Sequence, residues 1–355
     1  MWPRTDLIEL LGISHPIVQA PMAGGPTTPA LAAAVSNAGG LGSLGCAGLS
    51  LERLREQGEA TRTATNRPFN LNFFCHQEVA APADDAAAMR ELLSGYYNEL
   101  SLPEQPALIS PMPAFDEAML EVVLEVKPGV VSFHYGLPEA AMVERLKAAD
   151  ILLLCSATTV AEAKSLQAAG IDAVVAQGYE AGGHRGTFAE PYEAGEIGTF
   201  ALVPQIADAV SLPVIAAGGV ADGRGIAAAF ALGASGVQPG TAFLSCPEAG
   251  THPLYREALA TARDDSTRLT RAFSGRPARA LRNRFVDELA LHQGAAAPFP
   301  QQRALTGPLA AKAQAEGSSD FSTLWSGQAV ALNRGLPAAE LIEVMVSEAQ
   351  AILSP

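Results

Sequence analysis

The chain has 355 residues, of which 48% are hydrophobic and 17% are charged, and its formal net charge is −14. So much apolar sequence excludes an intrinsically disordered chain. The negative charge opposes binding to nucleic acid or to anionic lipid, and no local basic cluster offsets it. The length allows one large α/β barrel or two mid-sized domains.

The sequence carries no sign of export or of a membrane anchor. No charged leader precedes a long apolar block at the N-terminus, and no apolar run approaches the roughly 20 residues that span a bilayer. The four cysteines are widely spaced and form no CxxC pair, which disfavours a disulfide scaffold and a structural zinc site. We therefore expect a cytoplasmic protein, monomeric or homodimeric, without a metal.

Short apolar runs alternate with Ala-rich stretches along the chain. The runs lack polar alternation, as expected for strands that are buried on both faces of a parallel sheet. Eight such runs are present, over residues 16–22, 41–46, 69–75, 130–136, 151–157, 173–178, 213–219 and 235–240.

The stretches between the runs carry helix start signals. Thr28 followed by Pro29 begins one helix, and Thr158 or Thr159 begins another. Asp222 lies near the start of the helix between the last two predicted strands.

Eight strands alternating with helices predict a (β/α)8 TIM barrel. We expect residues 1–245, with part of the C-terminus, to form the barrel, and residues 246–355 to form a mostly helical capping segment. Residues 84–126 predict further helices in the long gap after the third strand. The alternative is an open, doubly wound sheet, which usually has a G-x-G-x-x-G turn that Gly24-Gly25 does not fit.

The residues at the C-terminal ends of the predicted strands indicate the chemistry, because the active site of a barrel lies there. No lysine is among them, which disfavours a Schiff-base aldolase. The six histidines are scattered, with no H-x-H pair after an early strand, which disfavours a metallohydrolase.

The turns after the seventh and eighth strands suit an anion. Gly218-Gly219 and the segment Gln238-Pro239-Gly240-Thr241 place unhindered backbone N–H groups next to helix starts, where barrels bind phosphate. The alternative is that these glycines only close tight turns.

Amide side chains end two other predicted strands. Asn72 and Gln177 can both donate and accept, which suits the edge of a flavin ring. Met22 and the turn at Gly24 would allow a flat ring to lie against them. Together with a phosphate site, these residues favour FMN over a plain sugar phosphate.

The loop over residues 177–186, QGYEAGGHRG, holds one histidine between glycines. An imidazole has a pKa near 6.5 and can remove a proton from an acidic carbon at neutral pH. His184 is therefore a candidate catalytic base. The alternative is a surface-loop histidine that binds a carbonyl group.

Motifs along most of the chain resemble those of the FMN-dependent nitronate monooxygenases, formerly called 2-nitropropane dioxygenases. The matching stretches run from about residue 13 to about residue 330 and include AQAPMAGG, FNLNFF, AQGYEAGGHRGTF, PVIAAGGVADGRG, QPGTAF and FSGRPARALRNRF. The stretches SFHYGLP and PLAAKAQAEGSSDFSTLWSGQAV resemble the first class of that family.

This resemblance implies oxidation of alkyl nitronates, such as propionate 3-nitronate, by O₂ to a carbonyl compound and nitrite, in a detoxifying role. It implies that His184 is the catalytic base. The FMN contacts that it implies, taken with the strand-end residues above, are Ala20, Pro21, Met22, Ala23, Gly24, Asn72, Gln177, Gly182, Gly183, Gly218, Gly219, Gln238, Pro239, Gly240 and Thr241.

Further residues are expected at the substrate. His134 and Tyr135 end the fourth strand and would line the pocket, and Ser326 could bond to the substrate. Phe299 stands near the place where some members present a tyrosine, which would remove a hydroxyl partner for the nitro group. In residues 274–279, SGRPAR, an arginine could reach the phosphate or a substrate carboxylate.

Pro239 also departs from the family pattern, since other members carry a more flexible residue there; proline loses one N–H donor and keeps its carbonyl. Two other functions fit many of these residues. An FMN-dependent NAD(P)H reductase, acting on an enoyl compound or a quinone, would use the same fold, and a non-catalytic FMN-binding protein would need no base.

Overall fold

A ring of parallel strands forms the centre of the molecule. The computed structural model describes residues 2–77, 86–107, 112–189 and 191–354. Seven strands form one parallel sheet, with neighbours that follow the order of the chain. They are β1 (Gly42–Gly45), β2 (Phe69–Phe74), β3 (Val130–His134), β4 (Leu152–Ala157), β5 (Ala173–Gln177), β7 (Val214–Ala217) and β8 (Gly236–Val237).

Residues 17 and 18 close this sheet into a ring. Ile17 pairs in parallel with Val237 of β8, and Val18 pairs with Leu41, just before β1. The ring thus has eight members, and the predicted (β/α)8 barrel is confirmed. The first member is only two bridges long, because the prolines at positions 16 and 21 have no N–H with which to extend the ladder.

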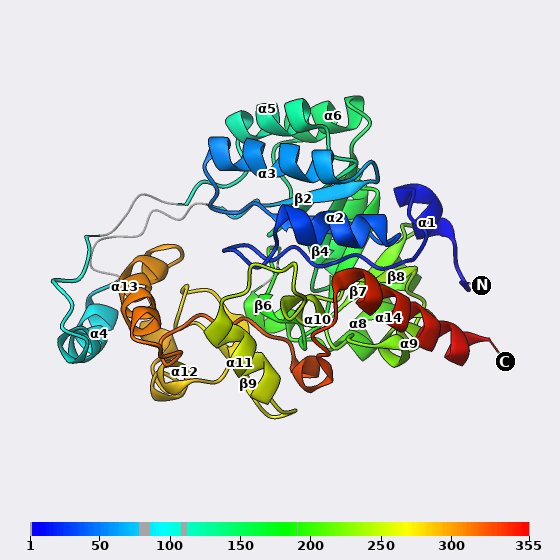
Figure 1. The fold of residues 1–355 in the computed structure, drawn as a ribbon. Coiled ribbons are helices and arrows are strands. Elements are labelled where there is room, and N and C mark those ends of the chain that lie inside the picture. Colours follow the sequence, from blue (N-terminus) through cyan, green and yellow to red (C-terminus); the bar gives the residue numbers. More distant parts are fainter. Residues whose placement is uncertain (1, 78–85, 108–111, 190, 355) are drawn as a thin grey trace.

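Helices cover the outside of the ring (Figure 1). Those that accompany the strands are α2 (Pro29–Asn37), α3 (Leu51–Ala64), α5 (Glu117–Val126), α6 (Ala140–Ala148), α7 (Val160–Ala168), α8 (Thr199–Ala209) and α9 (Gly223–Ala231). Helix α1 (Asp6–Leu11) packs instead against strand residues inside the ring, and α10 (Thr241–Leu244) begins at the cavity after β8.

The predicted helix starts are found in the structure. The Thr28 side chain accepts a hydrogen bond from a backbone N–H in the first turn of α2, and Thr159 does the same for α7. Asp222 accepts from two N–H groups at the start of α9. Each cap satisfies donors that the helix itself leaves free, which explains why these residues begin the helices.

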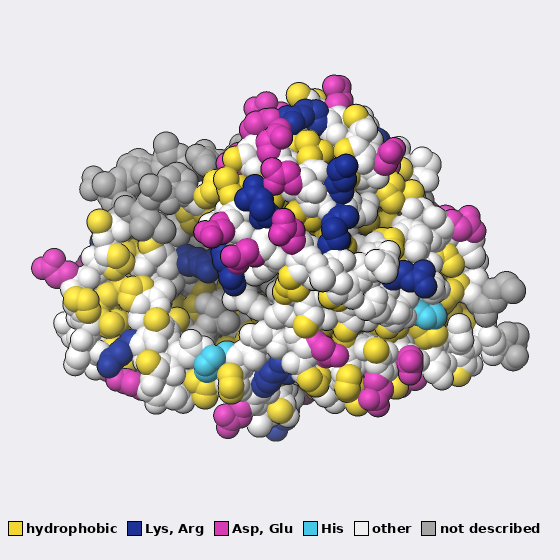
Figure 2. Space-filling view, turned by 45° about the horizontal axis from the view of Figure 1, so that its top comes forward, with side chains coloured by type: hydrophobic (Ala, Val, Ile, Leu, Met, Phe, Trp, Pro, Cys, Tyr) yellow, Lys and Arg dark blue, Asp and Glu magenta, His cyan; other side chains and the backbone are white. Residues whose placement is uncertain are grey.

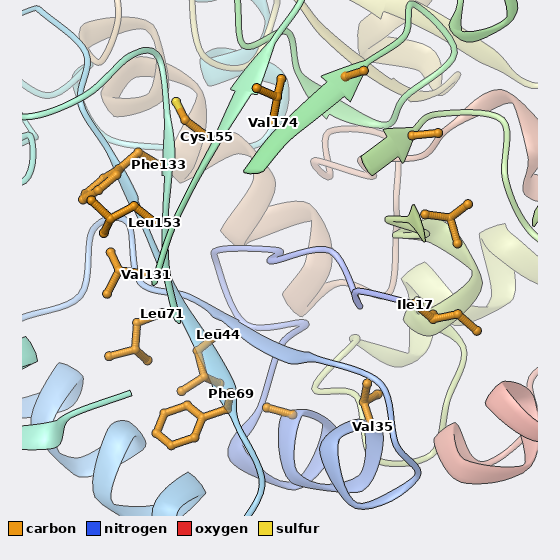
Figure 3. Packing of buried hydrophobic residues seen from close by; sticks show 14 of the residues in the cluster. Ile17, Val35, Leu44, Phe69, Leu71, Val131, Phe133, Leu153, Cys155 and Val174 are labelled. Carbon is orange, nitrogen blue, oxygen red and sulfur yellow. The ribbon is translucent and has the colours of Figure 1, made fainter. Parts of the chain in front are cut away.

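Both faces of the strands are buried, but in different surroundings. Val131 of β3 and Val174 of β5 belong to the large cluster of Figure 3, which also contains residues of α2, α3 and α5. Their neighbours Val130 and Val175 belong to a cluster formed mainly by the strands and α1. A strand that is apolar on both faces therefore fits a sheet with helices outside and packed side chains within.

A second core lies beside the barrel, formed by residues 87–99 and 267–325, which we call the cap. Met89 and Leu93 belong to the same buried cluster as Leu305 and Leu309. Because residues 87–99 lie between β2 and β3 in the chain, an insertion in the barrel joins the C-terminal segment (Figure 1). The cap helices are α4 (Ala87–Glu99), α12 (Arg284–Glu288) and α13 (Gln301–Ala315).

The cap also contains strands, which the sequence analysis does not predict. β9 (Thr267–Thr270) and β10 (Ala278–Leu281) pair in antiparallel fashion, and β10 also pairs with β6 (Gly183–His184). These strands are too short to give a clear alternation of polar and apolar residues. Their pairing fixes the backbone of His184 to the cap.

The remaining C-terminal helices are α11 (Pro253–Thr261) and α14 (Ala338–Leu353). Helix α14 packs against α9 and α2, so the chain ends on the barrel (Figure 1). The predicted boundary between residues 245 and 246 stays a prediction. Of the predicted helical region 84–126, α4 and α5 are seen, and residues 84, 85 and 108–111 lie outside the described residues.

Candidate active site

A cavity of about 410 Å³ opens where the parallel strands end, between the barrel and the cap. Most of the predicted site residues line it: Ala20, Pro21, Met22, Ala23, Gly24, Asn72, His134, Gln177, Gly182, Gly183, His184, Gly218, Gly219, Gln238, Gly240, Thr241 and Phe299. Three predicted residues are not in its wall, namely Tyr135, Pro239 and Ser326.

These three residues have other surroundings. Tyr135 is buried at a φ of 70°, and Ser326 is fully buried, with a hydroxyl that donates to Gly327 O at 3.3 Å. The carbonyl of Pro239 accepts a hydrogen bond from the Ala20 N–H at 2.9 Å, next to the closure of the ring. A role for any of the three in substrate or cofactor binding stays a prediction.

The turns after β7 and β8 present free peptide donors to the cavity. The N–H groups of Gly218, Gly219, Gly240 and Thr241 have no acceptor among the described residues. Gly218 has a φ of 109°, and a Cβ there would lie 2.9 Å from the nitrogen of Ala181. Only glycine adopts this turn readily, so the sequence itself keeps these donors accessible.

The three amide side chains in the cavity differ in how many hydrogen bonds they make to the protein. The Asn72 amide nitrogen donates to Ser132 Oγ at 2.9 Å and to the Ser132 carbonyl at 3.2 Å. The Gln177 side chain donates to the His184 carbonyl at 2.9 Å and accepts from the Gly186 N–H at 2.7 Å. Asn72 keeps its Oδ1 for a ligand, whereas Gln177 keeps only one amide N–H, because its Oε1 also accepts from Arg185 at 3.3 Å.

Gln238 is the third amide, and its side chain has no hydrogen-bond partner among the described residues. Both its donor and its acceptor are therefore available at the end of β8. An amide with both groups free can match a ligand edge that alternates donors and acceptors.

The His184 loop is held by a buried arginine. The Arg185 guanidinium, 2% exposed, donates to the carbonyls of Gln177 at 2.9 Å and of Gly178 and Gly195 at 2.5 Å. Burial lowers the pKa of Arg185 to about 10, which leaves it charged at neutral pH. The sequence analysis assigns no role to Arg185, and its position next to the histidine is the only local signal.

His184 lies among aromatic rings. The ring centroids of Phe74, Phe299 and Trp325 are 6.1, 6.1 and 5.1 Å from that of His184. Its Nε2 lies 2.8 Å from Ser274 Oγ of the cap. Burial, with smaller effects of His134 and nearby arginines, lowers the pKa of His184 to about 3. The imidazole is therefore neutral at pH 7 and able to accept a proton.

A second histidine stands beside the first. His134 Nδ1 lies 2.6 Å from Ser156 Oγ, and its Nε2 lies 3.3 Å from the carbonyl oxygen of His184. Burial is also the main cause that lowers the pKa of His134, to about 4. Both ring nitrogens of His134 are thus engaged, whereas His184 keeps one nitrogen without a partner among the described residues.

The arginines of residues 274–279 lie near the cavity but do not line it. The Arg276 guanidinium carbon is 4.2 Å from the centroid of the Tyr135 ring and 5.1 Å from that of Phe299. Arg279 donates to the Tyr179 carbonyl at 3.0 and 3.1 Å. That either arginine reaches a phosphate or a substrate stays a prediction.

Phe74 and Arg303 are among the lining residues that the sequence patterns did not single out. Phe74 follows Asn72 by two positions in β2 and so shares its face of the sheet, a signal that could have found it. Arg303 lies on α13, where no pattern indicates contact with the barrel. It also lines a neighbouring groove of about 1090 Å³.

Acidic and basic side chains are interspersed on the face that Figure 2 shows. Among the described residues, no group of three or more His, Cys, Asp or Glu side chains could hold a metal ion. In the same part of the chain, no helix combines the length and apolar character needed to cross a membrane.

Known proteins resemble this chain over nearly its whole length. The family model described as nitronate monooxygenase matches residues 4–348. A nitronate monooxygenase of Pseudomonas aeruginosa is 47% identical over 343 residues, which cover 96% of this chain and 97% of the relative. One of Paraburkholderia phytofirmans is 46% identical over 355 residues, with 97% and 95% covered.

A solved structure agrees with these matches. The nitroalkane oxidase of Streptomyces ansochromogenes superposes with a TM-score of 0.89 at 41% identity, covering 98% of this chain and 99% of that one. Similarity in sequence and in fold extends through the barrel, the cap and the strand-end cavity. The chain therefore belongs to the nitronate monooxygenase family, a family of oxidoreductases.

Proposed function

We propose that this chain binds FMN and oxidises alkyl nitronates with O₂ to a carbonyl compound and nitrite. The observation that carries the proposal is the arrangement of the cavity at the strand ends. Four free peptide N–H groups lie in its wall at β7 and β8, and a neutral imidazole lies under aromatic rings on the side of the cap. Membership of the family supports the reaction class.

The cavity fits FMN in size and in its donors. Its volume of about 410 Å³ lies in the range of small-molecule sites, roughly 300–1000 Å³. The free N–H groups of Gly218, Gly219, Gly240 and Thr241 would hold the phosphate, since peptide donors at Gly-rich turns favour anions.

The amide side chains suit the ring of FMN. Gln238 offers a donor and an acceptor, and Asn72 Oδ1 offers an acceptor, because the nitrogen of that amide is engaged by Ser132. Met22 and the backbone of Gly24 would lie against the ring. Bound FMN would accept electrons from the substrate and pass them to O₂.

His184 would act as the base for a neutral nitroalkane and would orient a nitronate. Its lowered pKa keeps the ring unprotonated across the neutral range, and it also makes the imidazole a weaker base than a free histidine. Its neighbours are aromatic rings and the hydroxyl of Ser274, and no carboxylate among the described residues is hydrogen-bonded to the imidazole.

A spectrum and an oxygen electrode test the proposal. The purified protein should be yellow and release FMN on denaturation, and it should consume O₂ with ethylnitronate or propionate 3-nitronate while nitrite accumulates. NADH should not reduce the flavin quickly without O₂. A colourless protein that takes up no FMN, or fast reduction by NADH without nitronate turnover, would exclude the proposal.

The role of His184 is tested by its replacement. His184→Asn should lower kcat/KM for a neutral nitroalkane by about 10²- to 10⁴-fold, the range that a general base contributes, and should affect a preformed nitronate much less. His292→Asn, the same change at an exposed position outside the cavity, is the matched control. Equal losses with both substrates would argue against a proton-transfer role.

A further inference from the structure

Two histidine–serine pairs lie side by side in the active-site cavity, and they differ in one respect. His134 pairs with Ser156, and His184 pairs with Ser274. A ring nitrogen can act as a base only if it carries a lone pair that no protein donor occupies. The partners of each ring therefore decide which nitrogen, if any, can take a proton.

The hydrogen bonds of His134 assign its tautomer. Its Nε2 faces the carbonyl oxygen of His184 at 3.3 Å, and a carbonyl only accepts, so Nε2 carries the hydrogen. Its Nδ1 then accepts from the Ser156 hydroxyl at 2.6 Å. Neither nitrogen is left for a substrate, so His134 supports the backbone of the catalytic loop.

The surroundings of Ser274 assign the tautomer of His184 in the same way. Ser274 is 3% exposed, and its Oγ lies 3.3 Å from the Arg276 carbonyl and 3.4 Å from the Arg276 nitrogen. If the hydroxyl donates to that carbonyl, its oxygen accepts both the Arg276 N–H and the His184 Nε2–H. The Ser274 hydroxyl, the Arg276 carbonyl and His184 Nε2 then each have a partner.

The opposite arrangement leaves a group without its partner. If the Ser274 hydroxyl donated to Nε2, the Arg276 carbonyl would lose that donor, and no other described residue supplies one. The hydrogen of His184 would then sit on Nδ1. Nδ1 has no partner among the described residues, and it could only donate to a substrate.

The fold holds Ser274 firmly in this place. The Thr306 hydroxyl donates to the Phe273 carbonyl at 2.9 Å, and the Gly275 N–H donates to the Arg271 carbonyl at 2.9 Å. On the other side of the bond, His184 pairs with Ala278 in the antiparallel ladder of β6 and β10. The cap therefore fixes both the backbone and the side chain of this histidine.

We propose that Ser274 is a positioning residue that accepts a hydrogen bond from His184 Nε2, so that Nδ1 is the nitrogen that takes the proton from the substrate. This inference rests on the proposed function, in which His184 is the base. The same hydrogen bond persists when the ring is protonated, because Nε2 donates in both states. Ser274 thus supports the imidazole before and after the transfer.

The first test separates proton transfer from oxidation. Ser274→Ala should lower kcat/KM for a neutral nitroalkane by about tenfold or more, a part of what a general base supplies, and should leave a preformed nitronate within about threefold. Ser274→Thr keeps the hydroxyl and should restore the ratio of the two activities. Ser322→Ala is the control, because Ser322 is also buried in the cap but outside the cavity wall.

The second test reads the tautomer directly and needs no turnover. In holoenzyme labelled with ¹⁵N-histidine, the His184 signals, assigned by their loss in His184→Asn, should show a protonated Nε2 and a bare Nδ1 in the wild type. In Ser274→Ala this preference should be lost. If Ser274→Ala does not fold, Ser274→Cys, which is similar in size and accepts hydrogen bonds weakly, carries the same expectation.

Three outcomes would overturn the inference: a protonated Nδ1 in the wild type, an unchanged tautomer and activity ratio in Ser274→Ala, or the loss of both activities to the same extent. An enzyme that shows the expected tautomers but oxidises no nitronate would refute the proposed function and leave the bond between Ser274 and His184 standing.

Discussion

The two sides of the active-site cavity are built from different parts of the chain. At β7 and β8, backbone N–H groups of two short turns provide the donors. Around His184, the side chains of Phe74 in β2 and of Ser274, Phe299 and Trp325 in the cap meet on one imidazole. The first side depends on local backbone angles, and the second depends on the docking of the cap.

This difference has a physical consequence. Peptide N–H groups do not titrate, and glycine turns hold their shape as long as a positive φ is allowed. An imidazole under aromatic rings changes its charge with pH and its position with its neighbours. The turns are thus expected to set cofactor affinity, and the cap to set the chemistry.

The largest effect on cofactor affinity is expected where a turn is obstructed. Gly218→Ala should raise the Kd of FMN roughly 10- to 100-fold, the loss of one hydrogen bond to a charged group, because the new methyl would press on the nitrogen of Ala181. Equilibrium titration of apoenzyme with FMN measures the change.

Gly170→Ala provides the matched control for that experiment. Gly170 also has a positive φ, of 82°, but its Cβ would meet only the end of the Lys147 side chain, at 3.6 Å. If Gly170→Ala leaves the Kd of FMN unchanged despite similar backbone strain, the weaker binding in Gly218→Ala comes from the obstructed turn after β7. Equal weakening in both variants would mean that strain alone lowers the affinity.

The next effect concerns pH and the other side of the cavity. His134 and His184 have pKa values lowered to about 4 and about 3, whereas an unfolded histidine titrates near 6.5. Between pH 6.5 and 4 the unfolded chain binds more protons, so the free energy of unfolding should fall as the pH falls. Above pH 6.5 this contribution should stay constant.

Chemical denaturation at several pH values tests this expectation. His15, whose pKa burial also lowers, adds to the slope in the wild type, so the comparison is with His134→Gln. Removing His134 should reduce the slope between pH 6.5 and 5 by up to about 1.4 kcal/mol per pH unit. An unchanged slope would mean that His134 titrates alike in the folded and unfolded chains.

The same division explains what the sequence could predict. Neighbouring residues encode the strands and the glycine turns at β7 and β8. They also encode the helix starts at Thr28, Thr159 and Asp222. Local patterns therefore sufficed for the barrel and for placing the glycine turns after β7 and β8 at the cavity.

The surroundings of His184 could not be predicted from local sequence patterns. The bond between His184 and Ser274 joins residues 90 positions apart, and nothing near either residue indicates it. The packing of α4 against α13 joins an insertion to the C-terminal segment beside the barrel. Ser326 was expected at the substrate and is fully buried. Its burial depends on packing next to the cap, which local sequence does not indicate.

The smallest effect is expected at Arg303, on the surface of the cap. This exposed side chain lines both the cavity and the neighbouring groove, and it has no ion pair among the described residues. A nitronate is an anion, so Arg303 should attract it, but solvent screens the interaction. Arg303→Met should therefore lower kcat/KM for a nitronate only about two- to fivefold, through KM, and Arg303→Lys should retain it.

The salt dependence distinguishes attraction from packing. If Arg303 acts through its charge, added salt should lower kcat/KM of the wild type for a nitronate toward the value of Arg303→Met. The value of kcat/KM for a neutral nitroalkane should change neither with salt nor with the substitution. A loss that is equal for neutral and anionic substrates and independent of salt would mean that the side chain acts by its volume. In that case only the imidazole side of the cavity, and not its rim, would distinguish the charge of the substrate.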